Sequence, residues 1–159
     1  METIYMAGGC LWGVQAFIKT IPGVVKTEAG RANGSSRTLD GDYDGYAECV
    51  KTVFDPEVLS LYELLGEFFQ IIDPYSVDKQ GIDVGRKYRT GIYSEDDDHL
   101  EAAASYITER PDASRIKVEV LPLMNYIPSA EEHQHHLDKF PDHYCHIPVD
   151  LMNKHRTGN

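Results

Sequence analysis

The chain has 159 residues, enough for a hydrophobic core of its own, and we expect a single domain over residues 1–159. Its 26 acidic and 15 basic residues give a net charge of −11, which disfavours nucleic acid and anionic membranes as partners. The sequence contains neither an apolar run near the ~20 residues of a membrane-spanning helix nor an N-terminal secretion signal, so we expect a cytoplasmic protein.

The first half of the chain predicts strands that alternate with helices. A strand at 2–7 precedes the Gly8-Gly9 pair, and a helix with one apolar face follows at 14–21. Pro22-Gly23 ends that helix. The next two elements are strands at 24–29 and 47–54, separated by a long loop rich in Gly, Ser and Asp, which is typical of functional loops.

The second half continues the alternation. Ser60 and Glu63 form a capping box before an apolar stripe that stops at Asp73-Pro74. The remaining expected elements are a strand at 88–93, a helix at 94–107 capped by Ser94, a strand at 116–121 and a coil-rich tail from Pro122. This order predicts an α+β fold, a ferredoxin-like two-layer α/β sandwich with a coil-rich C-terminal tail.

Three widely spaced cysteines, Cys10, Cys49 and Cys145, argue against both a structural disulfide set and a paired zinc ribbon. Cys10 stands at the start of the first predicted helix. There the unpaired backbone N–H groups and the helix dipole favour the thiolate. Cys10 is therefore expected to be nucleophilic, and the alternative is a small side chain that only packs the strand-to-helix junction.

Six segments in the same order resemble motifs of one enzyme family, the A-type peptide methionine sulfoxide reductases. They are GGCLWG, GYAECV, YELLGEFFQIIDP, QGIDVGRKYRTGIY, SAEEHQHHL and FPDHYC. The resemblance covers nearly the whole chain. It implies reduction of methionine S-sulfoxide, either in oxidised proteins or as the free amino acid, with thioredoxin or a similar dithiol as the recycling partner and no bound cofactor or metal.

The resemblance also implies roles for particular residues. A sulfoxide sulfur is electrophilic only when its oxygen is protonated or strongly hydrogen-bonded, and Glu48 matches the family's catalytic acid, whose pKa burial would raise. Asp83 and Tyr88 match the residues that complete the polar side of the pocket, and Trp12 matches an apolar wall for the substrate methyl group. Each also has a structural alternative: a solvated strand glutamate, a turn aspartate, a strand tyrosine and a core tryptophan.

Attack on the sulfoxide leaves a sulfenic acid on Cys10, which a second thiol can convert to a disulfide. Cys145 matches the cysteine of the family's tail segment and is the expected resolving residue. Cys49 is the competitor. Strand alternation puts its side chain on the face opposite Glu48, so we expect Cys49 to belong to the core.

Several residues depart from the family pattern. Leu11 replaces a phenylalanine of the methyl pocket, and Arg31 replaces a tyrosine that would donate to the sulfoxide oxygen. Arg31 is a permanent cation that could replace this donor, stabilise the thiolate or attract a substrate carboxylate. Tyr46, Ile72 and Lys87 also replace other family residues, and these changes bear on substrate preference more than on reaction class.

Two functions from other classes remain open. The substitutions at Leu11 and Arg31 would suit a non-catalytic binder of oxidised methionine. A zinc site would use ligand types gathered near the C-terminus, although their spacing matches no standard motif. Its candidate ligands are His133, His136, Cys145 and His146.

Overall fold

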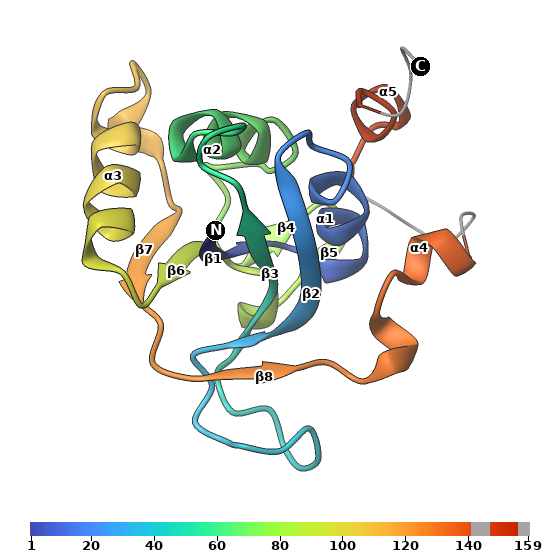
Figure 1. The fold of residues 1–159 in the computed structure, drawn as a ribbon. Helices are drawn as coiled ribbons and strands as arrows, with labels where there is room; N and C mark the ends of the chain where they lie inside the picture. The colour runs from blue at the N-terminus through green and yellow to red at the C-terminus, as the bar shows by residue number, and fades with distance from the viewer. Residues whose placement is uncertain (141–146, 156–159) are drawn as a thin grey trace.

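The computed structural model describes residues 1–140 and 147–155. The strands of its main sheet are β1 (Glu2–Gly8), β2 (Val24–Ala32), β3 (Ala47–Phe54), β6 (Thr90–Ser94), β7 (Glu119–Pro122) and β8 (Tyr126–Pro128). Among the described residues these six strands lie in the order β7-β6-β1-β3-β2-β8 (Figure 1). Only β6 and β7 pair in parallel, so the sheet is mixed.

The longer helices are α1 (Leu11–Ile18), α2 (Leu61–Gln70) and α3 (Asp97–Thr108). The run β1, α1, β2, β3, α2, β6 is the βαββαβ arrangement of ferredoxin-like folds, with β7 and β8 added at the two edges. The expected α+β two-layer fold is therefore confirmed.

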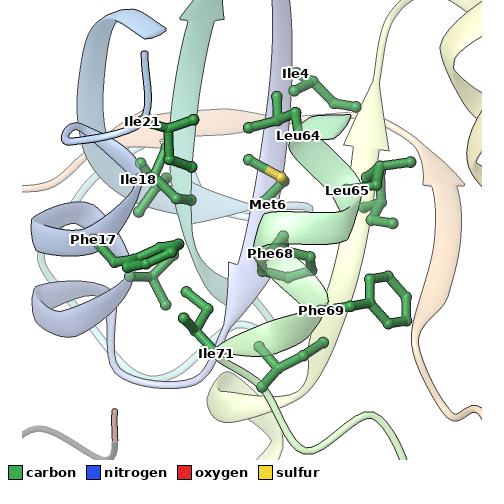
Figure 2. Packing of buried hydrophobic residues seen from close by; sticks show 14 of the residues in the cluster. Ile4, Met6, Phe17, Ile18, Ile21, Leu64, Leu65, Phe68, Phe69 and Ile71 are labelled. Atoms are coloured by element: carbon green, nitrogen blue, oxygen red, sulfur yellow. The ribbon is translucent and has the colours of Figure 1, made fainter. Parts of the chain in front are cut away.

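One face of the sheet carries the main hydrophobic core. Ile4 and Met6 of β1 point toward the helices, where they meet Phe17 of α1 and Leu64 and Phe68 of α2 (Figure 2). All five side chains are fully buried. Helix α2 begins at a capping box. The Ser60 hydroxyl accepts a hydrogen bond from the Glu63 backbone N–H, and the Glu63 carboxylate accepts one from the Ser60 backbone N–H.

The opposite face of the sheet carries a smaller cluster. Tyr5, Cys49 and Tyr93 pack there, each from a different strand, and Tyr126 covers them. Cys49 is 1% exposed. The expectation that Cys49 is a core residue is therefore confirmed.

Several predicted element ends were wrong. The first helix begins directly after Cys10, as expected, but it ends at Ile18 rather than at Ile21. Ser94 ends β6, and Asp96 caps α3 by accepting a hydrogen bond from the Asp98 backbone. Tyr88 lies in a 3₁₀ turn, η1 (Arg86–Tyr88), and the strand starts two residues later than expected.

Some short elements were not predicted at all. They are the hairpin strands β4 (Lys79–Gln80) and β5 (Asp83–Val84), the turns η2 (Ala113–Arg115) and η3 (Glu131–His133), the edge strand β8, and the helices α4 (His136–Lys139) and α5 (Val149–Met152). The tail from Pro122 is thus only partly coil. Figure 1 shows α4 and α5 on the side of the molecule where α1 lies, and both contact that helix.

Among residues 1–140 and 147–155, no helix is long and apolar enough to cross a membrane.

Candidate active site

The turn between β1 and α1 fixes the position of Cys10. Gly9 has a φ of +91°, which favours glycine. Gly8 lies so close to α2 that a Cβ on it would stand 2.8 Å from Cγ2 of Ile72. The two glycines therefore let the end of β1 pack closely against the core and let the chain turn sharply after it. Cys10 then occupies the N-cap of α1, beside backbone N–H groups that favour a thiolate.

Cys10 opens onto a pocket of about 460 Å³. The pocket lining consists of Cys10, Leu11, Trp12, Arg31, Glu48, Ile82, Asp83, Lys87, Tyr88, Ser129 and His133. These residues come from both ends of the chain and from six separate elements, α1, β2, β3, β5, η1 and η3, together with residues beside them. A larger hollow of about 830 Å³ lies at the start of α3, but its lining includes five acidic residues and none of the expected site residues.

The pocket brings together seven of the eight residues expected from the sequence. Cys10, Leu11 and Trp12 come from the start of α1, and Arg31 and Glu48 face each other on β2 and β3. Asp83 and Tyr88 complete the group. Cys145 lies outside the described residues.

Glu48 brings a largely buried carboxyl group to the pocket. Its Oε2 is buried and has no hydrogen-bond partner among the described residues. Burial raises the pKa of Glu48 to about 7, against the opposing effects of Lys87 and Arg31 and with the support of Asp83. A backbone hydrogen bond from Leu11 lowers it slightly. Glu48 can therefore hold a proton near neutral pH and release it to a bound substrate.

Tyr88 and Asp83 also line the pocket, close enough to Glu48 to act on its charge or be acted on by it. Burial first, and the neighbouring Glu48 second, raise the pKa of Tyr88, so its hydroxyl remains a donor. Asp83 is held by the β4–β5 hairpin, and buried Gln80 of that hairpin bonds both the N–H and the C=O of Asp73 at 2.8 Å. This amide clamp fixes the hairpin against the end of α2.

Arg31 is turned toward an aromatic ring. Its guanidinium lies 4.4 Å from the centre of the Tyr46 ring, and its Nη1 donates to the Leu39 carbonyl at 3.2 Å. Lys87 is placed in a similar way, with its ammonium 5.1 Å from the centre of the Tyr88 ring. Two cations thus share the pocket with Glu48 and Asp83.

Trp12 joins the pocket to the C-terminal segment. Its ring stacks on His136 with 3.7 Å between ring centres, and its Nε1 donates to Nδ1 of His133 at 3.3 Å. Both histidines of the described part of the suggested zinc cluster therefore engage Trp12. Among residues 1–140 and 147–155, no group of three or more His, Cys, Asp and Glu side chains is placed to hold a metal.

Two glutamines hold that segment against β2 and α1. Gln134 bonds both the N–H and the C=O of Ala29 on β2 at 2.9 Å. Gln15 of α1 accepts from the His135 backbone at 2.8 Å and is fully buried. The positions of Trp12 and His133 are therefore fixed by amide hydrogen bonds as well as by ring contacts.

Four further residues line the pocket, and these are Ile82, Lys87, Ser129 and His133. Ile82 and Ser129 were not predicted, Lys87 was expected only to bear on substrate preference, and His133 was named only as a candidate zinc ligand. Ile82 and Lys87 each adjoin a predicted residue, so their place in the same loop was a usable signal. Ser129 follows β8, an element that the sequence pattern did not reveal.

The family described as Peptide methionine sulfoxide reductase matches residues 2–158. The protein named Peptide methionine sulfoxide reductase MsrA from Clostridium acetobutylicum is 41% identical over 165 residues, covering 98% of this chain and 100% of that protein. The crystal structure of reduced Mxr1 from Saccharomyces cerevisiae aligns with a TM-score of 0.83 at 30% identity, covering 91% of this chain and 88% of that one. Mxr1 in complex with Trx2 aligns with a TM-score of 0.62 at 26% identity, covering 82% of this chain and 81% of that one. The chain belongs to the peptide methionine sulfoxide reductase family.

Proposed function

We propose that this chain reduces methionine S-sulfoxide to methionine, with Cys10 as nucleophile and Glu48 as acid, in one domain that spans residues 1–159. The observation that carries the proposal is the meeting of these two groups in one pocket, a cysteine at a helix N-cap and a carboxyl whose pKa burial raises to about 7. Nucleophile and acid must both act at neutral pH, and the two environments favour the required forms.

In the first step the Cys10 thiolate attacks the sulfoxide sulfur while the sulfoxide oxygen takes a proton from Glu48. The protonated oxygen leaves as hydroxide with the electrons of the S–O bond while a bond forms between the Cys10 sulfur and the substrate sulfur. This oxygen then bonds to the Cys10 sulfur, and the S–S bond breaks with its electron pair on the methionine sulfur, so the products are methionine and a Cys10 sulfenic acid. The Tyr88 hydroxyl donates to the oxygen during the transfer, and Asp83 orients a neighbouring donor. Trp12 and Leu11 supply the apolar wall for the methyl group.

In the second step the thiol of Cys145 attacks the Cys10 sulfenic acid, which forms a disulfide and releases water. An external dithiol of the thioredoxin type then reduces this disulfide, so thiols are the only source of electrons that the cycle needs. The family resemblance of the tail segment supports the assignment of Cys145. A solved structure of the yeast relative Mxr1 in complex with Trx2 supports a thioredoxin-type partner.

The test is a turnover assay on separated epimers. The protein is incubated with methionine S-sulfoxide or R-sulfoxide and dithiothreitol, and the methionine formed is measured. We expect reduction of the S epimer only. Binding of the S epimer without methionine formation would instead identify a binding protein and overturn the proposal.

A further inference from the structure

The pocket contains two cations, Arg31 and Lys87, that form no ion pair within the part of the chain that the structure describes. The chain has 26 acidic and 15 basic residues. Among the described residues, five lysines and arginines pair with a carboxylate, and these are Lys19, Arg86, Arg89, Arg110 and Lys154. Arg89 bonds Glu119 at 3.2 Å, and Lys154 bonds Glu67 at 3.0 Å. Neither Arg31 nor Lys87 forms an ion pair with any carboxylate in residues 1–140 and 147–155.

Uncharged groups hold these two cations in place. The Tyr46 ring and the Leu39 carbonyl hold the Arg31 guanidinium, and the Tyr88 ring lies beside the Lys87 ammonium. A ring face and a carbonyl position a cation without cancelling its net charge. Both side chains therefore keep charge and donors for a group that enters the pocket.

The acids of the pocket neutralise these charges only in part. Burial raises the pKa of Glu48 to about 7, so a substantial fraction of this carboxyl is neutral at neutral pH. Asp83 supplies the other negative charge. Lys87 also lines a neighbouring hollow of about 270 Å³ together with Arg86, Tyr43 and Tyr46, and there Arg86 pairs with Asp78 at 3.7 Å.

We propose that Arg31 and Lys87 form a carboxylate-recognition site on the wall of the pocket, which makes the enzyme prefer substrates with a carboxylate beside the oxidised methionine. This carboxylate is either the α-carboxylate of the oxidised residue itself or the side chain of a neighbouring Asp or Glu. The proposal rests on the proposed function, since it concerns the substrate of the same pocket. Guanidinium and ammonium groups in a partly buried site are the donors that carboxylates bind best.

The experiment compares two substrates that differ only in charge. They are the S epimers of N-acetylmethionine sulfoxide, which has a carboxylate, and of its N-methylamide, which is neutral. We expect kcat/KM to be about tenfold higher for the carboxylate, the effect of one charge-assisted hydrogen bond. The preference should fall as salt is added, because salt screens the attraction.

Variants assign the preference to the two cations. Lys87→Gln and Arg31→Gln should each lower the ratio of the two kcat/KM values toward one, with the larger loss on the carboxylate substrate. Lys26→Gln is the matched control. It removes one positive charge from an exposed position on β2 outside the pocket lining, and the ratio should not change.

A second pair of substrates distinguishes the two sources of the carboxylate. N-acetyl-Asp-methionine sulfoxide N-methylamide is compared with the Asn peptide of the same length. A preference for the Asp peptide places recognition on a flanking side chain, and a preference confined to N-acetylmethionine sulfoxide places it on the α-carboxylate. Either result supports the proposal.

Equal kcat/KM values in both pairs would overturn it, and so would a preference that both pocket variants retain. If the S epimers of all four substrates remained unreduced, the proposed function itself would fail, which is a different result.

Discussion

Glu48 and Cys49 are neighbours on β3, yet they belong to different regions of the molecule. Glu48 faces the pocket with Cys10, and Cys49 packs on the other face of the sheet with Tyr5 and Tyr93. Burial raises the pKa of both groups. One physical cause therefore acts on two adjacent side chains.

The consequences are opposite because the reactive forms differ. A carboxyl acts as a general acid when it is protonated, so the higher pKa makes Glu48 useful at neutral pH. A cysteine reacts as the thiolate, so the higher pKa makes the Cys49 thiol inert. Burial thus favours the reactive form of Glu48 on one face of β3 and the unreactive form of Cys49 on the other face.

The largest effect is expected from the nucleophile. Cys10→Ser should abolish reduction of the S epimer, because a serine hydroxyl is neither ionised nor soft enough to attack sulfur at neutral pH. The measurement is methionine formed with dithiothreitol as reductant. Cys49→Ala is the control and should remain active. Full activity of Cys10→Ser would move the nucleophile elsewhere.

The second largest effect is expected from Glu48, the proposed acid. Glu48→Gln should lower the rate of sulfenic-acid formation by about two to four powers of ten, the usual contribution of a general acid. Single-turnover kinetics with a sulfenic-acid trap would measure this rate. Glu101→Gln, which removes an exposed carboxyl on α3, is the control. A rate within a few-fold of wild type would exclude Glu48 as the acid.

The sequence was sufficient for the βαββαβ core because local signals and packing agree there. The Ser60–Glu63 capping box and the apolar stripe after it marked α2, and the alternation of β3 placed Glu48 and Cys49 on opposite faces. The β8 strand could not be predicted in this way. It has three residues, and its pairing with Gly30 to Ala32 depends on contacts with a strand about a hundred residues earlier.

The same limit applies inside the pocket. The order of the motifs was enough to expect Cys10, Glu48 and Tyr88 in one site. It was not enough to show that Arg31 would stack on Tyr46, because that contact depends on how the loop between β2 and β3 folds back. Pairwise contacts between a strand and a long loop carry no periodic signal in the sequence.

A third prediction tests which cysteine resolves the sulfenic acid. Cys145→Ser should leave one rapid turnover per enzyme and slow repeated turnover with thioredoxin by more than about tenfold, because the first step needs only Cys10 and Glu48. Dithiothreitol should partly restore turnover. Mass spectrometry of the oxidised wild type should show a Cys10–Cys145 link with Cys49 as a thiol. A Cys10–Cys49 link would contradict the separation of the two faces.

A fourth prediction concerns the contribution of buried Cys49 to the stability of the fold. Cys49→Ser should lower the free energy of unfolding by about 2–3 kcal/mol, because the hydroxyl would be buried in an apolar cluster. Cys49→Ala removes the sulfur without adding a polar group and should cost less. Urea unfolding measures both. Activity per folded molecule should stay near wild type in each variant, and a loss of activity that exceeds the loss of folded protein would place Cys49 in the chemistry.

The smallest expected effect is a pH dependence of the free energy of unfolding that comes from the Glu48 carboxyl. In the folded chain the pKa of Glu48 is about 7, above its ordinary value of 4.5, so folding favours the protonated form. The stability that this proton contributes is fully present below about pH 4.5 and is lost as the pH rises through about 7. Glu48→Gln keeps an uncharged side chain at every pH. It should therefore match wild type near pH 4.5 and exceed it at pH 8.5 by about 1–2 kcal/mol, since residual solvent contact reduces the full effect.

Thermal unfolding at the two pH values measures this difference as a Tm shift of about 2–8 °C at pH 8.5. The exposed-site variant Glu101→Gln should show no such dependence. If Glu48→Gln and wild type differ by the same amount at both pH values, the Glu48 carboxyl titrates alike in the folded and unfolded chain. Burial on the Glu48 side of β3 would then not raise the pKa of this carboxyl.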